Sequence, residues 1–154
     1  MKKLNPDHMA AIAKTVNTSP FFELLSMEIK YLRLGESRIE VEVQKKHLQP
    51  YGMVHGGVCA SLVDASVYWA VYAGFGRAVG LTTVDLRLNY LAPVQEGKMI
   101  AKGRSIKTGK TICLGEATIE DENGKLLSHG TSTLMVMESL KIKGHSELPP
   151  KFLE

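Results

Sequence analysis

Apolar and polar residues alternate along several segments of the chain, and this two-residue period is typical of β-strands. In residues 38–44, Ile39, Val41 and Val43 lie on one face, and charged or amide side chains lie on the other. Strands are predicted over residues 27–34, 38–44, 81–90, 99–106, 111–120 and 126–137. Short turns join most successive strands, which predicts an antiparallel sheet.

The strand over residues 81–90 and the turn before the last strand have distinct signatures. The alternation places apolar or aromatic side chains of this strand on one face: Val84, Leu86, Leu88 and Tyr90. Asn123-Gly124 predicts a hairpin turn in which both central residues have positive φ.

Residues 58–73 form the longest apolar run, and its length decides its secondary structure. Strands usually span four to eight residues, so the run predicts a helix. A helix that is apolar all round is buried or crosses a membrane. The run is shorter than the roughly 18 residues of a membrane span and contains Asp64. We therefore expect a buried central helix that ends at Gly74 and Gly76.

The two ends of the chain differ in their predicted order. Asn5 and Pro6 are favoured at the N-cap and first position of a helix, which we expect to run to about residue 17. Residues 21–25 are expected to pack into the core. Residues 139–154, which contain two consecutive prolines, predict a loose tail after a single domain over residues 1–138.

The composition is that of an ordinary globular domain: 154 residues, 44% apolar and 23% charged. The net charge of +3 is too small to indicate nucleic-acid binding, and no apolar run is long enough for a membrane span. Two cysteines do not form a disulfide scaffold and fit a reducing compartment. Residues 1–13 lack the apolar segment of a signal peptide. We therefore expect a cytoplasmic protein with no nucleic-acid or membrane partner.

The start of the predicted central helix carries His55-Gly56-Gly57, whose glycines leave backbone N–H groups unshielded. The first N–H groups of a helix lack partners within it and lie at the positive end of its dipole. They predict an anion site, or an oxyanion hole for a carbonyl that becomes negative. The alternative is that the glycines only let the loop turn tightly into the helix.

Asp64 lies two turns further along the same helix. A carboxylate on a buried helix is costly unless it is paired or faces water, so Asp64 is either functional or satisfied by the backbone or Tyr68. Gly56 and Asp64 are eight residues apart, about 12 Å along a helix. One carbonyl carbon cannot lie within reach of both groups of one chain. Either one group plays no part, or antiparallel helices of a two-fold dimer share the site.

Other catalytic motifs are weaker. The stretch Gly103–Thr111 resembles a phosphate-binding loop, but Arg104 stands where the first glycine is required. The Gly-x-Ser-x-Gly elbow is absent around Ser61, and Cys59 is better explained as a small buried residue than as a nucleophile. The five histidines lack metal-ligand spacing, so we expect no metal site.

Two stretches carry a resemblance to a known family: His55-Gly56-Gly57 followed by Leu62-Val63-Asp64, and residues 81–86. Over residues 21–137 the chain resembles the hot-dog thioesterases of the 4-hydroxybenzoyl-CoA and phenylacetate-degradation type. The resemblance implies an α+β hot-dog fold, in which a five- or six-stranded antiparallel sheet wraps a long central helix. It also implies dimers, which commonly pair into tetramers, with the active sites at the dimer interface.

The resemblance also implies a role for each residue that matches. The N–H of Gly56 would polarise the thioester carbonyl, and Asp64 of the partner subunit would act as general base or as a nucleophile. His55 would support the loop, Thr83 would lie near the attacking water, and Gln49 would lie near the thioester. The implied reaction is hydrolysis of an acyl-CoA to a free acid and CoA, with no cofactor.

Substrate-binding candidates lie at three places. Gly57 belongs to the predicted anion site. Lys107 and Lys110 occupy a hairpin that in relatives lies near the nucleotide end of CoA, and the alternative for them is a solvated turn. Tyr68, with Trp69 and Tyr72, is a candidate wall for an acyl pocket, although aromatic residues at helical spacing are often core residues.

Two other functions remain open. One is hydration or dehydration of an enoyl thioester, but the residues just after Asp64 contain no histidine, unlike such relatives. The other is a non-catalytic acyl-CoA-binding module, whose relatives usually add a DNA-binding segment.

Overall fold

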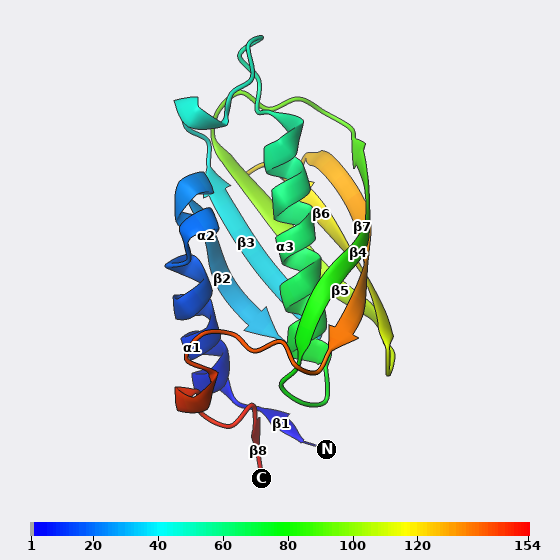
Figure 1. Cartoon of the computed structure of the whole chain (residues 1–154). Helices are drawn as coiled ribbons and strands as arrows, with labels where there is room; N and C mark the ends of the chain where they lie inside the picture. The colour runs from blue at the N-terminus through cyan, green and yellow to red at the C-terminus, as the bar shows by residue number, and fades with distance from the viewer. Residues whose placement is uncertain (1) are drawn as a thin grey trace.

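Six antiparallel strands curve around one long helix in the computed structural model of the chain, which describes residues 2–154 (Figure 1). Met1, the first residue of the predicted domain, lies outside the described residues. The helices are α1 (Pro6–Asn17), α2 (Pro20–Leu25) and α3 (Gly56–Gly74), with the 3-10 turns η1 (Lys45–His47) and η2 (His145–Glu147). The strands are β1 (Lys3–Leu4), β2 (Met27–Arg33), β3 (Glu36–Glu42), β4 (Gly80–Tyr90), β5 (Lys98–Thr108), β6 (Ile112–Glu120), β7 (Leu126–Met137) and β8 (Phe152–Leu153).

The large sheet has the strand order β2-β3-β5-β6-β7-β4, and every neighbouring pair is antiparallel. The α+β hot-dog fold, with its central helix and short N-terminal helix, is therefore confirmed. Strand β4 pairs with β7 and not with β5, which follows it in the chain, so β4 forms one edge and β2 the other. Helices α1 and α2 pack beside β2. Within residues 2–154, no strand pairs with the outer edge of β4.

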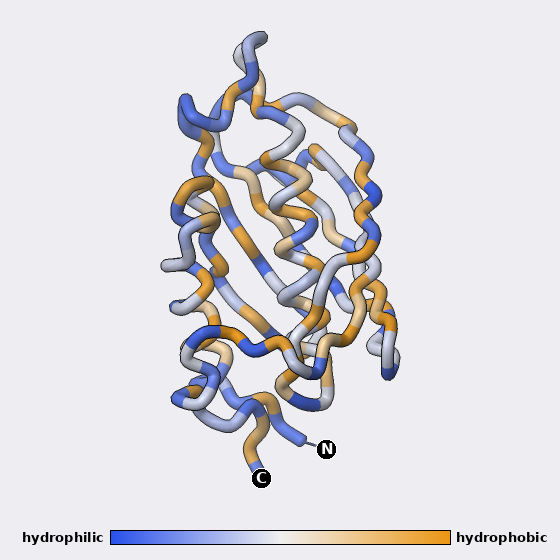
Figure 2. Tube along the Cα trace, viewed as in Figure 1, coloured by the Kyte–Doolittle hydropathy of each residue, from blue (hydrophilic) through white to orange (hydrophobic). Residues whose placement is uncertain are grey.

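Helix α3 packs on the inner face of the sheet through fully buried side chains: Leu62, Val63, Val67, Ala70 and Val71. Two glycines of the sheet permit this close approach. A Cβ at Gly115 would lie 2.6 Å from Cγ1 of Val67, and one at Gly103 would collide with the carbonyl oxygen of Ser66. Along the strands, hydrophobic and hydrophilic positions alternate as the two-residue period predicts (Figure 2).

One face of α3 is not covered by the sheet, in contrast to the helix buried all round that the apolar run predicts. Half-buried residues spaced three to four apart occupy this face: Ala60, Ser61, Asp64, Ala65, Tyr68 and Trp69. The helix begins at Gly56, two residues before the apolar run, and ends at Gly74 as predicted. No helix of residues 2–154 combines the length and apolarity that a bilayer crossing requires.

A bulge in β4 breaks the regular alternation expected for residues 81–90. The pairing of β4 with β7 shifts between Thr83 and Asp85, which leaves Val84 between them 53% exposed. The prediction that Val84 shares a face with Leu86 is therefore wrong. Since a bulge adds one residue to one strand, Thr83 before it and Tyr90 after it both point towards α3.

The N-terminal segment follows the sequence prediction for α1 but not for the residues after it. The side chain of Asn5 caps α1 by accepting a hydrogen bond from the N–H of Asp7, at 3.0 Å. Residues 21–25 form helix α2, in which Phe22 is buried but Phe21 and Leu24 are 54% and 65% exposed. The expectation that this segment packs into the core holds for Phe22 and for the half-buried Leu25, but not for Phe21 or Leu24.

The turn between β6 and β7 differs in detail from its prediction. Gly124 has φ of 81°, but Asn123 does not have positive φ. The Asp121 side chain accepts from the N–H groups of Asn123 and Lys125, both at 2.9 Å, and its carbonyl accepts from Gly124. The side chain of Asp121 thus organises a turn that needs only one residue with positive φ.

Residues 139–154 are ordered against the rest of the protein, so the prediction of a loose tail is wrong. The segment crosses the C-terminal end of α3, contains η2, and ends in β8, which pairs with β1 (Figure 1). Lys151 is only 6% exposed. A charged side chain is not expected to be buried, and here the buried Lys151 anchors the segment through its hydrogen bonds.

Candidate active site

Among the described residues, the backbone N–H of Gly56 at the N-terminal end of α3 has no acceptor. The Nδ1 atom of His55 accepts from the N–H of Gly57 at 2.7 Å, and the carbonyl of His55 accepts from the N–H of Val58 at 2.9 Å. Within residues 2–154, no hydrogen-bond acceptor pairs with the N–H of Gly56. His55 therefore supports the helix start as its N-cap. Gly56 keeps a free donor, and the N–H of Gly57 is occupied.

Tyr90 covers Gly56 and was not among the predicted site residues. Its hydroxyl donates to the carbonyl oxygen of Gly56 at 3.0 Å. A Cβ at Gly56 would lie 2.9 Å from Cζ and Oη of Tyr90, so this contact requires glycine. The only sequence signal for Tyr90 was its place on the apolar face of β4, and the pairing with residue 56 is a long-range contact.

A cavity of about 410 Å³ opens beside Gly56, and Cys59, Tyr90 and Ser128 are among its lining residues. Burial raises the pKa of the Cys59 thiol, which disfavours the thiolate. This agrees with the interpretation of Cys59 as a buried residue and not a nucleophile.

Asp64 lines a second cavity and is held there by Thr83. The hydroxyl of Thr83 donates to Oδ1 of Asp64 at 2.8 Å, across the gap between β4 and α3. This cavity is about 460 Å³, and of the described residues that line it, Asp64 alone carries a charge. Its other walls include Phe22, Trp69 and Leu86. The Thr83 bond fixes one carboxylate oxygen and leaves the other for chemistry.

Tyr68 does not satisfy Asp64, although it lies one turn along the helix. Its hydroxyl instead accepts a hydrogen bond from the N–H of Leu81 at 3.3 Å. Burial raises the pKa of Tyr68, so its hydroxyl stays protonated. The Tyr68 ring forms part of the wall of the Asp64 cavity.

Gly56 and Asp64 line different cavities of the same chain. The residues around Gly56 come from the loop before α3 and the end of β4, whereas those around Asp64 come from α2 and the middle of α3. This separation agrees with the eight-residue spacing along the helix, about 12 Å. One protomer presents the two groups but does not bring them to a common point.

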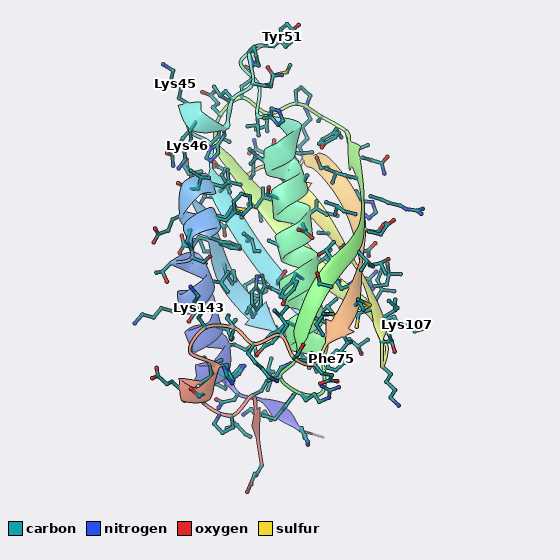
Figure 3. The ribbon with its side chains drawn as sticks, viewed as in Figure 1. Lys45, Lys46, Tyr51, Phe75, Lys107 and Lys143 are labelled. Carbon is teal, nitrogen blue, oxygen red and sulfur yellow. The ribbon has the colours of Figure 1, made fainter. Side chains whose placement is uncertain are left out.

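Gln49, Lys107 and Lys110 are not brought to either cavity within one protomer. The Oε1 atom of Gln49 accepts from the N–H of Tyr51 within its own loop. Lys107 is exposed near the tip of the β5–β6 hairpin, at the opposite end of the molecule from Tyr51 (Figure 3), and Lys110 is exposed in the same hairpin.

Comparisons with known proteins point to one family. A family model described as the thioesterase superfamily matches residues 51–128. The chain is 30% identical over 125 residues to 1,4-dihydroxy-2-naphthoyl-CoA hydrolase of Listeria monocytogenes, a match that spans 77% of this chain and 97% of that protein. It is 24% identical over 130 residues to acyl-coenzyme A thioesterase 13 of Mus musculus, with 82% of this chain and 92% of that protein covered.

Solved structures show the same fold. A thioesterase from Haemophilus influenzae has a TM-score of 0.78 at 24% identity and covers 88% of this chain and 94% of its own. A variant of the phenylacetic acid degradation protein PaaI from Thermus thermophilus has a TM-score of 0.71 at 24% identity, over 77% of this chain and 100% of its own.

Proposed function

The chain belongs to the thioesterase superfamily, and from this premise we propose that it hydrolyses an acyl-CoA thioester at a site shared by two subunits. The observation that carries the proposal is that the chain presents both a free backbone N–H at Gly56 and a carboxylate at Asp64, each lining a separate cavity. The printed names of two relatives, which specify CoA-thioester substrates, support CoA as the leaving group.

The free edge of β4 supports a two-fold dimer. An unpaired edge strand exposes a row of backbone donors and acceptors that another strand can pair with. Strand β4 also exposes Val84 and Leu86, and the uncovered face of α3 lies beside it. Pairing of two β4 strands about a two-fold axis covers both surfaces. It sets two α3 helices antiparallel, so that Gly56 faces Asp64 of the partner subunit.

The residues then divide the reaction between the two subunits. The N–H of Gly56, at the positive end of α3, stabilises the oxygen of the thioester carbonyl as it gains charge. Asp64 of the partner subunit takes a proton from water while the water oxygen attacks the carbonyl carbon. When the C=O bond re-forms, the C–S bond breaks, and CoA leaves as a thiol with the proton that Asp64 returns. In the alternative route, the carboxylate of Asp64 attacks the carbonyl carbon and the C–S bond breaks, so that CoA leaves as the thiolate; water then hydrolyses the mixed anhydride to the free acid and the Asp64 carboxylate.

Thr83 and His55 are positioning residues in this scheme. The hydroxyl of Thr83 holds one oxygen of Asp64. His55 holds the N–H of Gly57, which keeps the first turn of α3 in place. Gln49, Lys107 and Lys110 retain their proposed contacts with the thioester and the CoA phosphates only in the dimer.

Activity towards a panel of acyl-CoA substrates tests the proposal. Asp64→Asn is expected to lower kcat at least about 100-fold, because it removes the base or nucleophile. Thr83→Val, which keeps the shape of the side chain, is expected to lose less. Full activity of Asp64→Asn on the best substrate would overturn the mechanism. Saturable binding without turnover by the wild type would instead favour a binding module.

Subunit mixing tests whether the site is shared. Asp64→Asn and Gly56→Ala homodimers are expected to be weakly active alone. In a mixed dimer, one shared site carries both substitutions and the other carries neither. Random exchange therefore restores about one quarter of wild-type activity. If each chain holds a complete site, every site in the mixture carries one substitution and activity stays low.

A further inference from the structure

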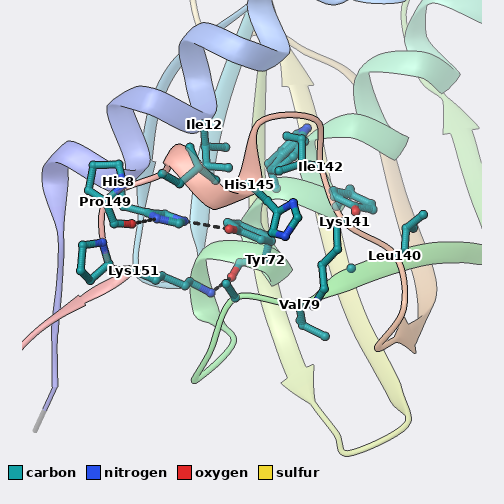
Figure 4. A pocket seen from close by; sticks show the side chains of 16 residues that line it. His8, Ile12, Tyr72, Val79, Leu140, Lys141, Ile142, His145, Pro149 and Lys151 are labelled. Atoms are coloured by element: carbon teal, nitrogen blue, oxygen red, sulfur yellow. Dashed lines mark hydrogen bonds between the residues drawn. The ribbon is translucent and has the colours of Figure 1, made fainter.

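A third cavity lies at the C-terminal end of α3, beneath the segment that the sequence predicts to be loose (Figure 4). Its volume is about 450 Å³, within the range of small-molecule sites, about 300–1,000 Å³. Helices α1 and α3 form its floor, and residues 140–151, which we call the C-terminal strap, close it. The predicted catalytic residues Gly56 and Asp64 are not among its lining residues.

The strap is anchored by Lys151, whose Nζ donates to three backbone carbonyls, one in the last turn of α3 and two just after the helix. These carbonyls belong to Tyr72, Phe75 and Arg77, with distances of 2.7 Å to Phe75 and 2.9 Å to Arg77. The protonated ammonium group has three N–H donors, and in this form all of them are used. Lys151 therefore holds the strap closed and has no donor left for a ligand.

His8 makes the second anchor and is also fully paired. One ring nitrogen, Nδ1, lies 2.6 Å from the carbonyl of Pro149, and the other, Nε2, lies 2.8 Å from the hydroxyl of Tyr72 (Figure 4). A carbonyl can only accept, so Nδ1 carries the proton and the Tyr72 hydroxyl donates to Nε2. Burial lowers the pKa of His8 and raises that of Tyr72 to about 12, which favours this neutral pair.

With these polar groups paired, apolar side chains dominate the remaining wall: Ile12, Trp69, Val79, Leu140, Ile142 and Leu148. Such a lining favours a hydrocarbon or aryl group, because a polar ligand atom would find no free partner among the anchoring groups. The polar side chains of Lys141 and His145 also line the cavity, and both are exposed residues of the strap.

Two residues belong to the walls of both this cavity and the Asp64 cavity. Tyr68 and Trp69 line both of them. Asp64, Tyr68 and Tyr72 follow one another at four-residue intervals, so they lie along one side of α3 over about 12 Å. An acyl group whose thioester lies at Asp64 would have to extend along this side of the helix, past Trp69, to reach the strap cavity.

We propose that the strap cavity holds the distal apolar part of the acyl group, so that the substrates are CoA thioesters of medium or long alkyl chains or of aryl-alkyl acids. This inference rests on the proposed thioester hydrolysis for the position of the reacting carbonyl. The cavity belongs to the subunit that supplies Asp64. Each methylene that enters it is expected to raise kcat/KM about three- to fourfold until the cavity is filled.

The test compares chain-length selectivity in the full-length protein. The ratio of kcat/KM for decanoyl-CoA to that for acetyl-CoA is measured for the wild type, for Ile142→Phe, which fills the cavity, and for Lys143→Met, an exposed residue of the same strap. Ile142→Phe is expected to lower the ratio at least tenfold, and Lys143→Met to leave it unchanged. An unchanged ratio in a folded Ile142→Phe protein overturns the proposal.

A binding measurement separates failure of this inference from failure of the proposed function. Trp69 is the only tryptophan of the chain, so its fluorescence reports directly on the cavity wall. Decanoic acid is expected to shift the emission of the wild type, more weakly that of Ile142→Phe, and acetate is expected to have no effect. If no acyl-CoA is hydrolysed but this shift occurs and is weaker in Ile142→Phe, the cavity assignment stands and the reaction does not; an equal shift in both proteins would place the ligand in the Asp64 cavity and overturn the assignment. If hydrolysis occurs without any shift, the cavity assignment is wrong.

Discussion

The two ends of helix α3 differ in whether the backbone groups that lack partners within the helix are hydrogen-bonded by side chains. Every helix begins with N–H groups and ends with C=O groups that lack partners within it. At the start of α3, His55 takes the N–H of Gly57 and leaves that of Gly56 free. Beyond the end of the helix, Lys151 binds the carbonyls of Phe75 and Arg77 as well as that of Tyr72.

We infer from this difference that the N-terminal end of α3 serves function and that its C-terminal end serves stability. A free N–H at the positive end of the dipole can stabilise a negative oxygen on a substrate, at the expense of leaving one donor to solvent. A cation on the carbonyls at the negative end stabilises the helix and fixes the strap. Substitutions at the first end should therefore affect turnover most, and substitutions at the second should affect unfolding most.

The largest effect is expected from Gly56→Ala. The added methyl group would lie 2.9 Å from the ring and hydroxyl of Tyr90, so the helix start must shift and the free N–H loses its position. We expect kcat to fall about 100- to 1,000-fold, as when an oxyanion donor is removed. In Gly56→Ala/Tyr90→Ala the methyl group has room, so the combined loss should be smaller than the product of the single losses. Independent losses in this cycle would contradict the steric explanation.

At the other end, Lys151→Met is expected to lower the free energy of unfolding by about 2–3 kcal/mol. The substitution keeps much of the apolar stem but removes three hydrogen bonds, each worth about 1 kcal/mol, although the carbonyl of Tyr72 still accepts from the N–H of Phe75. Urea unfolding measures the change. Lys143→Met, an exposed control in the same strap, should stay within about 0.5 kcal/mol of wild type. Equal stabilities of the two variants would show that Lys151 does not anchor the strap.

A smaller effect is expected at the N-cap. His55→Ala removes the acceptor for the N–H of Gly57 and should lower the free energy of unfolding by about 1 kcal/mol. His55→Asn, which supplies a side-chain acceptor suited to this position, should recover most of the loss. Unfolding curves of both variants provide the measurement, and an Asn variant no more stable than the Ala variant would argue against a capping role.

The smallest effect is the dependence of stability on pH. Burial lowers the pKa of Lys151 from 10.5 to about 7, so between these values the folded state binds fewer protons than the unfolded state. Stability therefore rises with pH in this window. The difference in free energy of unfolding between wild type and Lys151→Met should grow by about 0.5–1 kcal/mol from pH 7 to pH 8. A difference that shrinks would show that the three carbonyls outweigh burial and hold the ammonium charged.

Much of the fold was predictable because its signals are local. The N-cap at Asn5, the helix in the apolar run and the strands all follow from residues within one or two turns of each other. The bulge at Val84 was not predictable from the alternation, because it depends on how β4 pairs with β7. The same holds for the turn at Asn123, where the side chain of Asp121 replaces a second residue with positive φ.

The candidate site was predictable only in part. The residues that matched a motif, Gly56 and Asp64, were recognised, and their spacing along a helix indicated a site shared by two chains. Thr83 came from the family resemblance, and the structure places it on Asp64. Tyr90 was missed, since nothing near it in the sequence points to a partner 34 residues away.

The sequence alone determined the periods of its segments, the helix start at the two glycines, and the distance between Gly56 and Asp64 along α3. These depend on backbone geometry and on neighbours a few residues apart. Only the tertiary structure decided three other features. Strand β4 lies at an edge of the sheet, the N–H of Gly56 has no acceptor within residues 2–154, and Lys151 closes a cavity over the end of α3. These depend on which distant segments pack together, and burial can turn a charged residue of an apparent tail into the anchor of a cavity.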